Sequence, residues 1–304
     1  MRYKICHTTT YTYNQPVILK PHILRLSPRC DGTQKLHSFT LDVEPKPTSI
    51  SEIIELDGNA IAKLWFNTST EQLTISATSV VETCRTDPDN IQLEPWATQL
   101  PIDYPDYWSS QLQPYQQFYD PLLVDAIKQL AQDIYQQVKG DTVNFVKTLN
   151  QHLYSHCKPK YREKGAPWSP SKTWQLKRGS CRDLAVLFMD VCRVMGLGAR
   201  FVSGYQEGNL ERSQRYLHAW VEIYLPGAGW QGYDPNQGVV VTDRHIPLVA
   251  CALPRYAAPI SGAIATTKSV GEGARKIESD MKINLSIARD EYSGFQSETI
   301  HLSS

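Results

Sequence analysis

Hydrophobic and polar residues alternate with a period of two through the first part of the chain. This period is that of a strand with one buried face. Asp57-Gly58-Asn59 is typical of a hairpin turn between two such strands. The strands are expected at 2–13, 37–43, 61–66 and 73–81. Residues 1–95 are therefore predicted to form an all-β N-terminal domain.

Apolar residues recur at helical spacing in the middle of the chain. The first stripe consists of Leu123, Ile127, Leu130, Ile134 and Val138, and Gly140 ends that helix. A second helix is expected to begin at Asp141 or Thr142, with Val146, Leu149 and Leu153 on its inner side. A third is expected from about 181 to 195. The pattern therefore predicts that helices follow the all-β N-terminal domain.

The remaining segments are expected to be strands, loops and a tail. Strands are predicted at about 199–205, 216–225 and 230–233, with an irregular connector at 86–118 and a loop at 158–178. We divide the chain into 1–95, a core at 96–260 and a C-terminal tail at 261–304. A further strand at 281–288 would pair back with the N-terminal domain.

Composition narrows the classes of partner and cofactor. The 304 residues include 31 Lys and Arg against 31 Asp and Glu, so nothing favours nucleic acid or a membrane as partner. The N-terminus has the pattern of a strand, and we expect no export signal. Seven cysteines at irregular spacing, with no CxxC pair, argue against a disulfide framework or a zinc site. We therefore expect a cytoplasmic protein with no metal and no cofactor.

Cys181 lies at the start of the third predicted helix. Ser180 and Asp183 form the pattern of a helix capping pair around it. A helix N-terminus stabilises a thiolate, and its free N–H groups can bind an oxyanion. Gly179 allows a tight turn and a close substrate backbone. The alternative is a buried structural cysteine, as expected for Cys192 in mid-helix.

His218 lies in a strand whose two faces differ. One face carries Ala219, Val221, Ile223 and Leu225, whereas the other carries His218, Trp220, Glu222 and Tyr224. A core histidine would be expected on the apolar face. His218 is therefore a candidate general base, with a plain surface histidine as the alternative.

Asp234 ends the following strand, which Pro235 stops. A solvated aspartate at a strand end is the alternative to a role beside His218. If residues 227–229 form a three-residue hairpin loop, Asp234 lies opposite Glu222, four residues along from His218. That separation is about 13 Å, too far for a hydrogen bond. A triad then requires a bulge or a different register.

Further candidates surround the cysteine. Arg182 could bind an anionic group, although most such arginines make surface ion pairs. Tyr161, Trp168 and Trp174 precede the cysteine in the predicted loop. They could line a cleft or pack as a lid.

Several motifs occur together in an order typical of one family. They are Gly179-Ser180-Cys181-Arg182-Asp183, His218-Ala219-Trp220, Gly229-Trp230 and Asp234-Pro235. Residues 160–240 resemble bacterial transglutaminase-like proteins, and the N-terminus resembles the β region often joined to that core. The resemblance implies an α+β, papain-like transglutaminase core with helices packed on an antiparallel sheet. It also implies that Cys181 is the nucleophile, His218 the base and Asp234 its orienting carboxylate.

The resemblance leaves the reaction open. It implies cysteine-dependent acyl transfer or hydrolysis at amide or peptide bonds through a thioester, with a protein or peptide as substrate. Relatives include cross-linking enzymes, hydrolases and inactive members, so two alternatives stay open. One is a peptidase or amidase with water as sole acceptor, and the other is a non-catalytic binding or scaffold protein. We match no acidic residues to the calcium sites of animal transglutaminases.

Overall fold

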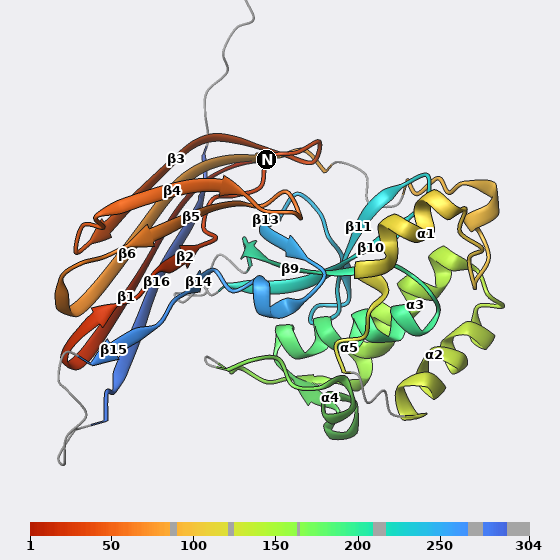
Figure 1. Cartoon of the computed structure of the whole chain (residues 1–304). Coiled ribbons are helices and arrows are strands. Elements are labelled where there is room, and N and C mark those ends of the chain that lie inside the picture. Colours follow the sequence, from red (N-terminus) through yellow and green to blue (C-terminus); the bar gives the residue numbers. More distant parts are fainter. Residues whose placement is uncertain (86–89, 121–124, 163–164, 209–216, 267–275, 291–304) are drawn as a thin grey trace, which may run out of the picture.

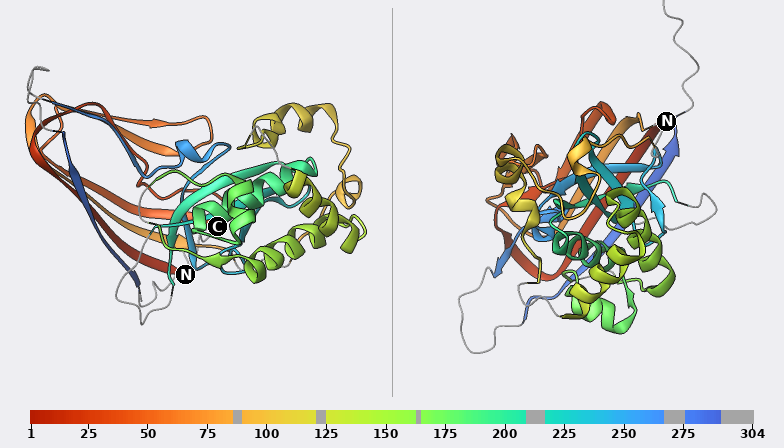
Figure 2. Two further views of the ribbon diagram at one scale, coloured as in Figure 1. Left: turned by 90° about the horizontal axis from the view of Figure 1, so that it is seen from below. Right: turned by 90° about the vertical axis from the view of Figure 1, so that its right-hand side faces the viewer.

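A computed structural model describes residues 1–85, 90–120, 125–162, 165–208, 217–266 and 276–290. Figure 1 shows a β sandwich on one side, helices on the other, and a sheet between them. Figure 2 shows the same arrangement in two further views. This mixed architecture confirms the predicted α+β fold class with an N-terminal β region.

The N-terminal β sandwich follows from the alternation of its strands. Its six N-terminal strands are β1 (Arg2–Leu19), β2 (His22–Leu24), β3 (Gln34–Glu44), β4 (Ser49–Ile54), β5 (Ala60–Trp65) and β6 (Ser69–Thr83). β1 and β6 pair along almost their whole length. The side chains of β6 alternate between buried and half-buried positions, and the buried set includes Leu73 and Ile75. The hairpin predicted at Asp57-Gly58-Asn59 is confirmed, since β4 and β5 pair on either side of it.

Strands from the C-terminal part complete this sandwich. They are β14 (Ile260–Ser261), β15 (Ile264–Thr266) and β16 (Ser279–Arg289). β16 pairs with β1 from Tyr3↔Arg289 to Tyr13↔Ser279, and β15 pairs with the end of β1. The two ends of the described chain therefore belong to one sheet.

The helices lie around the central sheet (Figure 1). They are α1 (Asp106–Leu112), α2 (Asp125–Gln137), α3 (Thr142–His156), α4 (Pro170–Leu176) and α5 (Cys181–Val194). α5 packs on one face of the sheet, whereas Trp108 of α1 lies against Tyr224, whose side chain is on the other face. α3 begins as predicted, with the Asp141 carboxylate accepting the backbone N–H of Asn144 at 2.8 Å. Leu123, placed in the first predicted helix, lies outside the described residues. α5 is the central helix, and its residues 183–193 are all buried.

Two predictions for the segments around these helices were wrong in part. The connector at 86–118 contains α1, and the loop at 158–178 contains α4, β7 (Lys158–Pro159) and β8 (Arg178–Gly179). Both helices have only seven residues. A helix of two turns depends on packing more than on its own periodicity, so its apolar pattern is too short to be recognised in the sequence.

The central sheet has the order β12-β11-β10-β9-β13 and is antiparallel throughout. Its strands are β9 (Ala199–Gln206), β10 (His218–Leu225), β11 (Gly229–Asp234), β12 (Val239–Val240) and β13 (His245–Cys251). Residue 216, with which the strand predicted at 216–225 began, lies outside the described residues. β13 was not predicted, because every residue in it is buried and its sequence lacks alternation.

Both faces of this sheet are covered. One face packs on α5 through Ala219, Val221 and Ile223, whereas the sandwich covers the other face, where Trp220 and Glu222 are buried. The sheet face that carries His218 therefore has polar residues but is largely buried against the sandwich rather than exposed to solvent. Among the described residues, we find no helix with the length and apolar character needed to cross a bilayer.

Candidate active site

Cys181 is the first residue of α5, as predicted from its capping pair. The Asp183 carboxylate accepts the backbone N–H of Ser180 at 2.7 Å and its hydroxyl at 2.9 Å. It also accepts the backbone N–H of Trp168 at 2.7 Å and pairs with Arg162 at 2.6 Å. Asp183 therefore ties the helix start to the preceding loop and fixes the position of the thiol.

Gly179 is required at this helix start. A Cβ on it would lie 2.8 Å from the Cβ of Asp183. The backbone at Gly179 passes so close to the Asp183 side chain that no residue with a Cβ fits there. The contact is made to the protein's own side chain, so the close approach of a substrate backbone to Gly179 stays a prediction.

His218 lies at the first residue of β10, beside the thiol. Burial raises the pKa of Cys181, but a hydrogen bond to the His218 side chain, the charge of that imidazole and the backbone N–H of Ala219 all lower it. The net result is a thiol pKa below its ordinary value. This combination favours a thiolate, in contrast to Cys192, whose pKa burial raises well above its ordinary value.

Asp234 binds the far side of the His218 ring. Its Oδ2 accepts a hydrogen bond from His218 Nε2 at 2.7 Å. Burial lowers the pKa of His218, yet the charge and hydrogen bond of Asp234, together with Cys181, raise it to about 10. Burial raises the pKa of Asp234, and the charge of His218 reverses this, so that the carboxyl stays ionised. Since Nε2 is engaged, Nδ1 is the ring nitrogen left for the thiol.

The expected register of this hairpin was wrong, and the difference is what brings Asp234 to His218. β10 and β11 pair as Leu225↔Gly229 and Val221↔Tyr233, so that Glu222 lies opposite Gly232. Continued by one residue, this register places Asp234 opposite Trp220 and diagonal to His218. Diagonal neighbours on one sheet face lie about 7–8 Å apart at the backbone, which long side chains can span.

A tertiary contact fixes the turn that sets this register. Gly227 has φ +92° and packs against the backbone of 92–94, where a Cβ would lie 2.6 Å from Glu94 N. The backbone N–H of Glu94 also donates to the carbonyl of Pro226 at 2.9 Å. The loop therefore spans residues 226–228 rather than 227–229, and no bulge is needed.

A second histidine, which the sequence analysis missed, also binds Asp234. His245 Nε2 lies 3.3 Å from the same Oδ2, and the backbone N–H of Thr242 donates to His245 Nδ1 at 3.5 Å. Because Nδ1 accepts, Nε2 carries the proton and donates to Asp234. Asp234 Oδ1 accepts the backbone N–H of Asn236 at 3.0 Å. The carboxylate is thus held by three donors.

These same three side chains are the group most suited to a metal ion among the described residues. The ligand atoms of His218, Asp234 and His245 lie within 4.8 Å of one another. Each of these atoms already takes part in the hydrogen bonds above. The arrangement is that of one aspartate hydrogen-bonded to two histidine rings, so the N–H protons of His218 and His245 point at the carboxylate oxygen between them.

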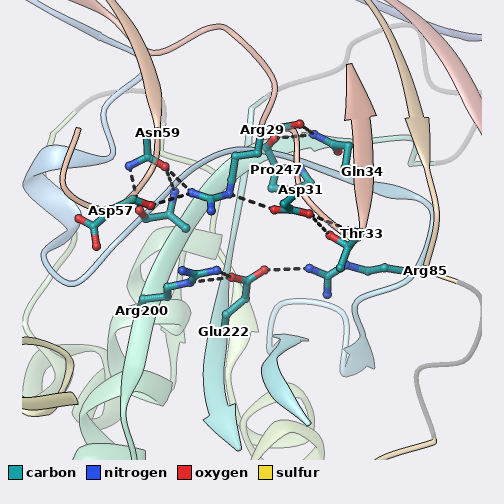
Figure 3. Close-up of polar contacts among 11 residues, drawn as sticks. Arg29, Asp31, Thr33, Gln34, Asp57, Asn59, Arg85, Arg200, Glu222 and Pro247 are labelled. Atoms are coloured by element: carbon teal, nitrogen blue, oxygen red, sulfur yellow. Dashed lines mark hydrogen bonds and ion pairs between the residues drawn. The ribbon is translucent and has the colours of Figure 1, made fainter. Parts of the chain in front are cut away.

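Buried ion pairs support β10 from the side of the sandwich. Figure 3 shows Glu222 between two arginines. Arg200 binds it at 2.6 Å, and Arg85 from the N-terminal part binds it at 3.0 Å. The Asn59 side chain from the hairpin bonds both backbone groups of Ala250 at 2.9 and 3.0 Å. These contacts connect the sandwich to the sheet that carries His218.

A cleft opens in front of the thiol. It has a volume of about 1640 Å³ and is lined by Cys181, His218 and residues from the loops around them. Of the loop aromatics considered from the sequence, Tyr161 lines the cleft, whereas Trp174 packs on His152. Small-molecule sites usually measure about 300–1,000 Å³, so this cleft has room for a polymer segment.

Comparisons with known proteins agree with this fold. The bacterial transglutaminase-like N-terminal region matches residues 3–82, and the transglutaminase-like superfamily matches residues 128–235. A solved structure from Cytophaga hutchinsonii has a TM-score of 0.69 and 19% identity, covering 97% of this chain and 93% of that one. Its similarity shows the fold.

Sequence relatives extend the comparison. An uncharacterized protein of Mycobacterium tuberculosis is 24% identical over 263 residues, covering 81% of this chain and 82% of that protein. A protein-glutamine gamma-glutamyltransferase of Pseudomonas aeruginosa is 39% identical over 70 residues, covering 21% of this chain and 10% of that protein. With its N-terminal region and its core both matched, the chain belongs to the transglutaminase-like superfamily.

Proposed function

We propose that the protein is a cysteine-dependent acyl transferase or hydrolase that acts on amide bonds of protein or peptide substrates. The observation that carries this proposal is the contact chain from Cys181 through His218 to Asp234. It combines a thiol of lowered pKa with an imidazole of raised pKa. Such a pair favours thiolate and imidazolium together near neutral pH.

Each step then uses a group whose position is known. The Cys181 thiolate attacks the amide carbonyl carbon, and the carbonyl oxygen becomes an oxyanion beside the N-terminus of α5. The C–N bond breaks as His218 gives its proton to the leaving nitrogen. In the second half, water or an amine gives a proton to His218 and attacks the thioester, which releases the thiolate.

The test is selective labelling of one thiol among seven. In the wild type, iodoacetamide should alkylate Cys181 fastest at about pH 7, as mapped by peptide mass spectrometry. Cys181→Ala should lose this labelling and all turnover of amide substrates. Cys6 is exposed, so Cys6→Ser is the matched control and should leave turnover intact. Turnover that persists in Cys181→Ala would refute the proposal.

Product analysis identifies the acceptor. A substrate incubated with and without a primary amine yields an amide adduct if the thioester is transferred, and a carboxylate if it is hydrolysed. The non-catalytic alternative predicts that Cys181 alkylates no faster than an ordinary thiol. The buried Asp234 and the lowered pKa of Cys181 support an enzyme over a scaffold.

A further inference from the structure

The cleft in front of Cys181 is strongly cationic. Among the described residues its lining includes five basic side chains, Lys160, Arg162, Arg182, Arg244 and Arg255, and one carboxylate, Glu207. The chain as a whole has equal numbers of acidic and basic residues. The excess of positive charge is therefore a local property of this cleft.

Two of the five basic side chains are neutralised within the protein. Arg162 pairs with the fully buried carboxylate of Asp183 at 2.6 Å. Arg244 pairs with Glu207 at 2.9 Å, and Arg289 binds the same carboxylate from β16 at 2.5 Å. Glu207, the single acidic residue of the lining, is thus already paired with arginines and does not neutralise the remaining basic side chains.

The other three have no carboxylate partner among the described residues. Lys160 and Arg255 each lie over an aromatic ring, 5.4 and 4.9 Å from its centre. Arg182 donates to a backbone carbonyl at 2.7 Å. Aromatic faces and carbonyl groups orient a cation but leave its net charge in place. Each of the three charges is therefore available to a ligand in the cleft.

Their positions connect these charges to the reacting thiol. Arg182 directly follows Cys181 in α5. The backbone N–H of Lys160 donates to the carbonyl of Gly179 at 2.7 Å, two residues before the thiol. Arg255 comes from the short 3-10 helix that follows β13. Like charges gathered in a concave site focus the electrostatic potential and concentrate ligands of opposite sign.

We propose that this cleft selects acidic peptide segments, with carboxylates close to the amide that Cys181 attacks. The inference rests on the proposed function and specifies its substrate class. Ion pairs of partly exposed side chains each change an association constant by up to about fivefold. Three such charges acting together give a preference on the order of tenfold at low ionic strength.

Matched electrophiles test this selectivity. Three peptidyl chloromethyl ketones share one backbone and carry Glu-Glu, Gln-Gln or Lys-Lys beside the reactive ketone. Each alkylates Cys181 when the thiolate displaces chloride, and mass spectrometry of the intact protein gives the rate. The Glu-Glu probe should react about tenfold faster than the Gln-Gln probe at low salt, and the ratio should approach one in about 0.5 M salt.

Variants assign the preference to the named charges. Arg255→Glu should lower the ratio of the Glu-Glu to the Gln-Gln rate by about fivefold, and Arg182→Gln by about twofold. Lys46 is exposed in the N-terminal sandwich and does not line the cleft, so Lys46→Gln should leave the ratio unchanged. Arg255 makes no side-chain hydrogen bond to a described residue, so its variant tests the idea even if Arg182→Gln fails to fold.

The outcomes separate the two proposals. Equal rates for the three probes in the wild type, with Cys181 still labelled, would overturn the acidic preference and leave the thiol chemistry standing. If no probe labels Cys181, and iodoacetamide does not either, the proposed function fails and this inference fails with it.

Discussion

Replacement of Asp234 by asparagine is the sharpest test of the candidate active site. The change keeps the shape of the side chain but removes the charge that faces His218. In the wild type, burial lowers the pKa of His218 and the charge of Asp234 is the largest effect that raises it, to about 10. A rise from 6.5 to about 10 corresponds to roughly 5 kcal/mol of preference for the imidazolium, shared between Asp234 and the Cys181 thiolate.

Without that charge, burial is expected to lower the pKa of His218. Less of the imidazole is then protonated at pH 7, so the Cys181 thiolate loses much of the support of its ion-pair partner and its pKa rises. Loss of an orienting carboxylate from a comparable triad lowers turnover by roughly 10⁴-fold. We expect a loss of about 10³- to 10⁴-fold in Asp234→Asn, with the folded structure retained.

The assay is the rate of Cys181 alkylation by iodoacetamide between pH 5 and 10. The wild type should react well below the ordinary thiol pKa, whereas Asp234→Asn should shift the profile to higher pH. Asp133→Asn removes an exposed carboxylate on α2 and is the charge control. If Asp234→Asn keeps the wild-type profile, Asp234 does not hold the imidazolium and the reasoning is wrong.

The same variant has a consequence for stability. A raised pKa means that the folded state favours the protonated ring, so this contribution is complete below about pH 6.5 and is lost as pH rises through about 10. The difference in melting temperature between the wild type and Asp234→Asn should therefore be large at pH 6 and small above pH 10. A difference that is constant with pH would contradict the linkage.

Three further predictions concern groups around the site. His245→Phe removes a donor to Asp234 and should cost about 2 kcal/mol of stability in urea unfolding, with a smaller loss of turnover than Asp234→Asn. Glu222→Gln leaves two buried arginines without a carboxylate, so it should lower the free energy of unfolding by about 3–5 kcal/mol. Gly204→Ala would place a Cβ 2.3 Å from the carbonyl oxygen of Ile246, and should lower the free energy of unfolding by about 1–3 kcal/mol. If the urea midpoint of any of these variants equals that of the wild type, the contacts described for the substituted residue are contradicted.

The sequence by itself determined the features that depend on near neighbours. The capping pair of Ser180 and Asp183 lies within one helical turn, so it located the start of α5 and placed Cys181 there. Alternation in β10 correctly separated the residues that face α5 from those on the other side. The N-terminal strands and their hairpin followed from the same periodicity.

Only the tertiary structure decided how the three side chains meet. The register that places Asp234 diagonal to His218 depends on a turn held by Glu94, more than 130 residues before the turn in the chain. His245 reaches Asp234 from β13, a strand whose uniform burial hides it from periodicity. The covering of the polar sheet face by the sandwich was equally invisible in the sequence.

The physical reason is the range of the interactions involved. Caps and periodic faces depend on residues up to about four positions apart, so local sequence specifies them. Strand register, carboxylate–imidazole distances and the charge of a cleft depend on backbones packed from distant segments. The sequence placed Cys181 at a helix start, and the packed sheet brought the imidazole of His218, the carboxylate of Asp234 and the cationic cleft around it.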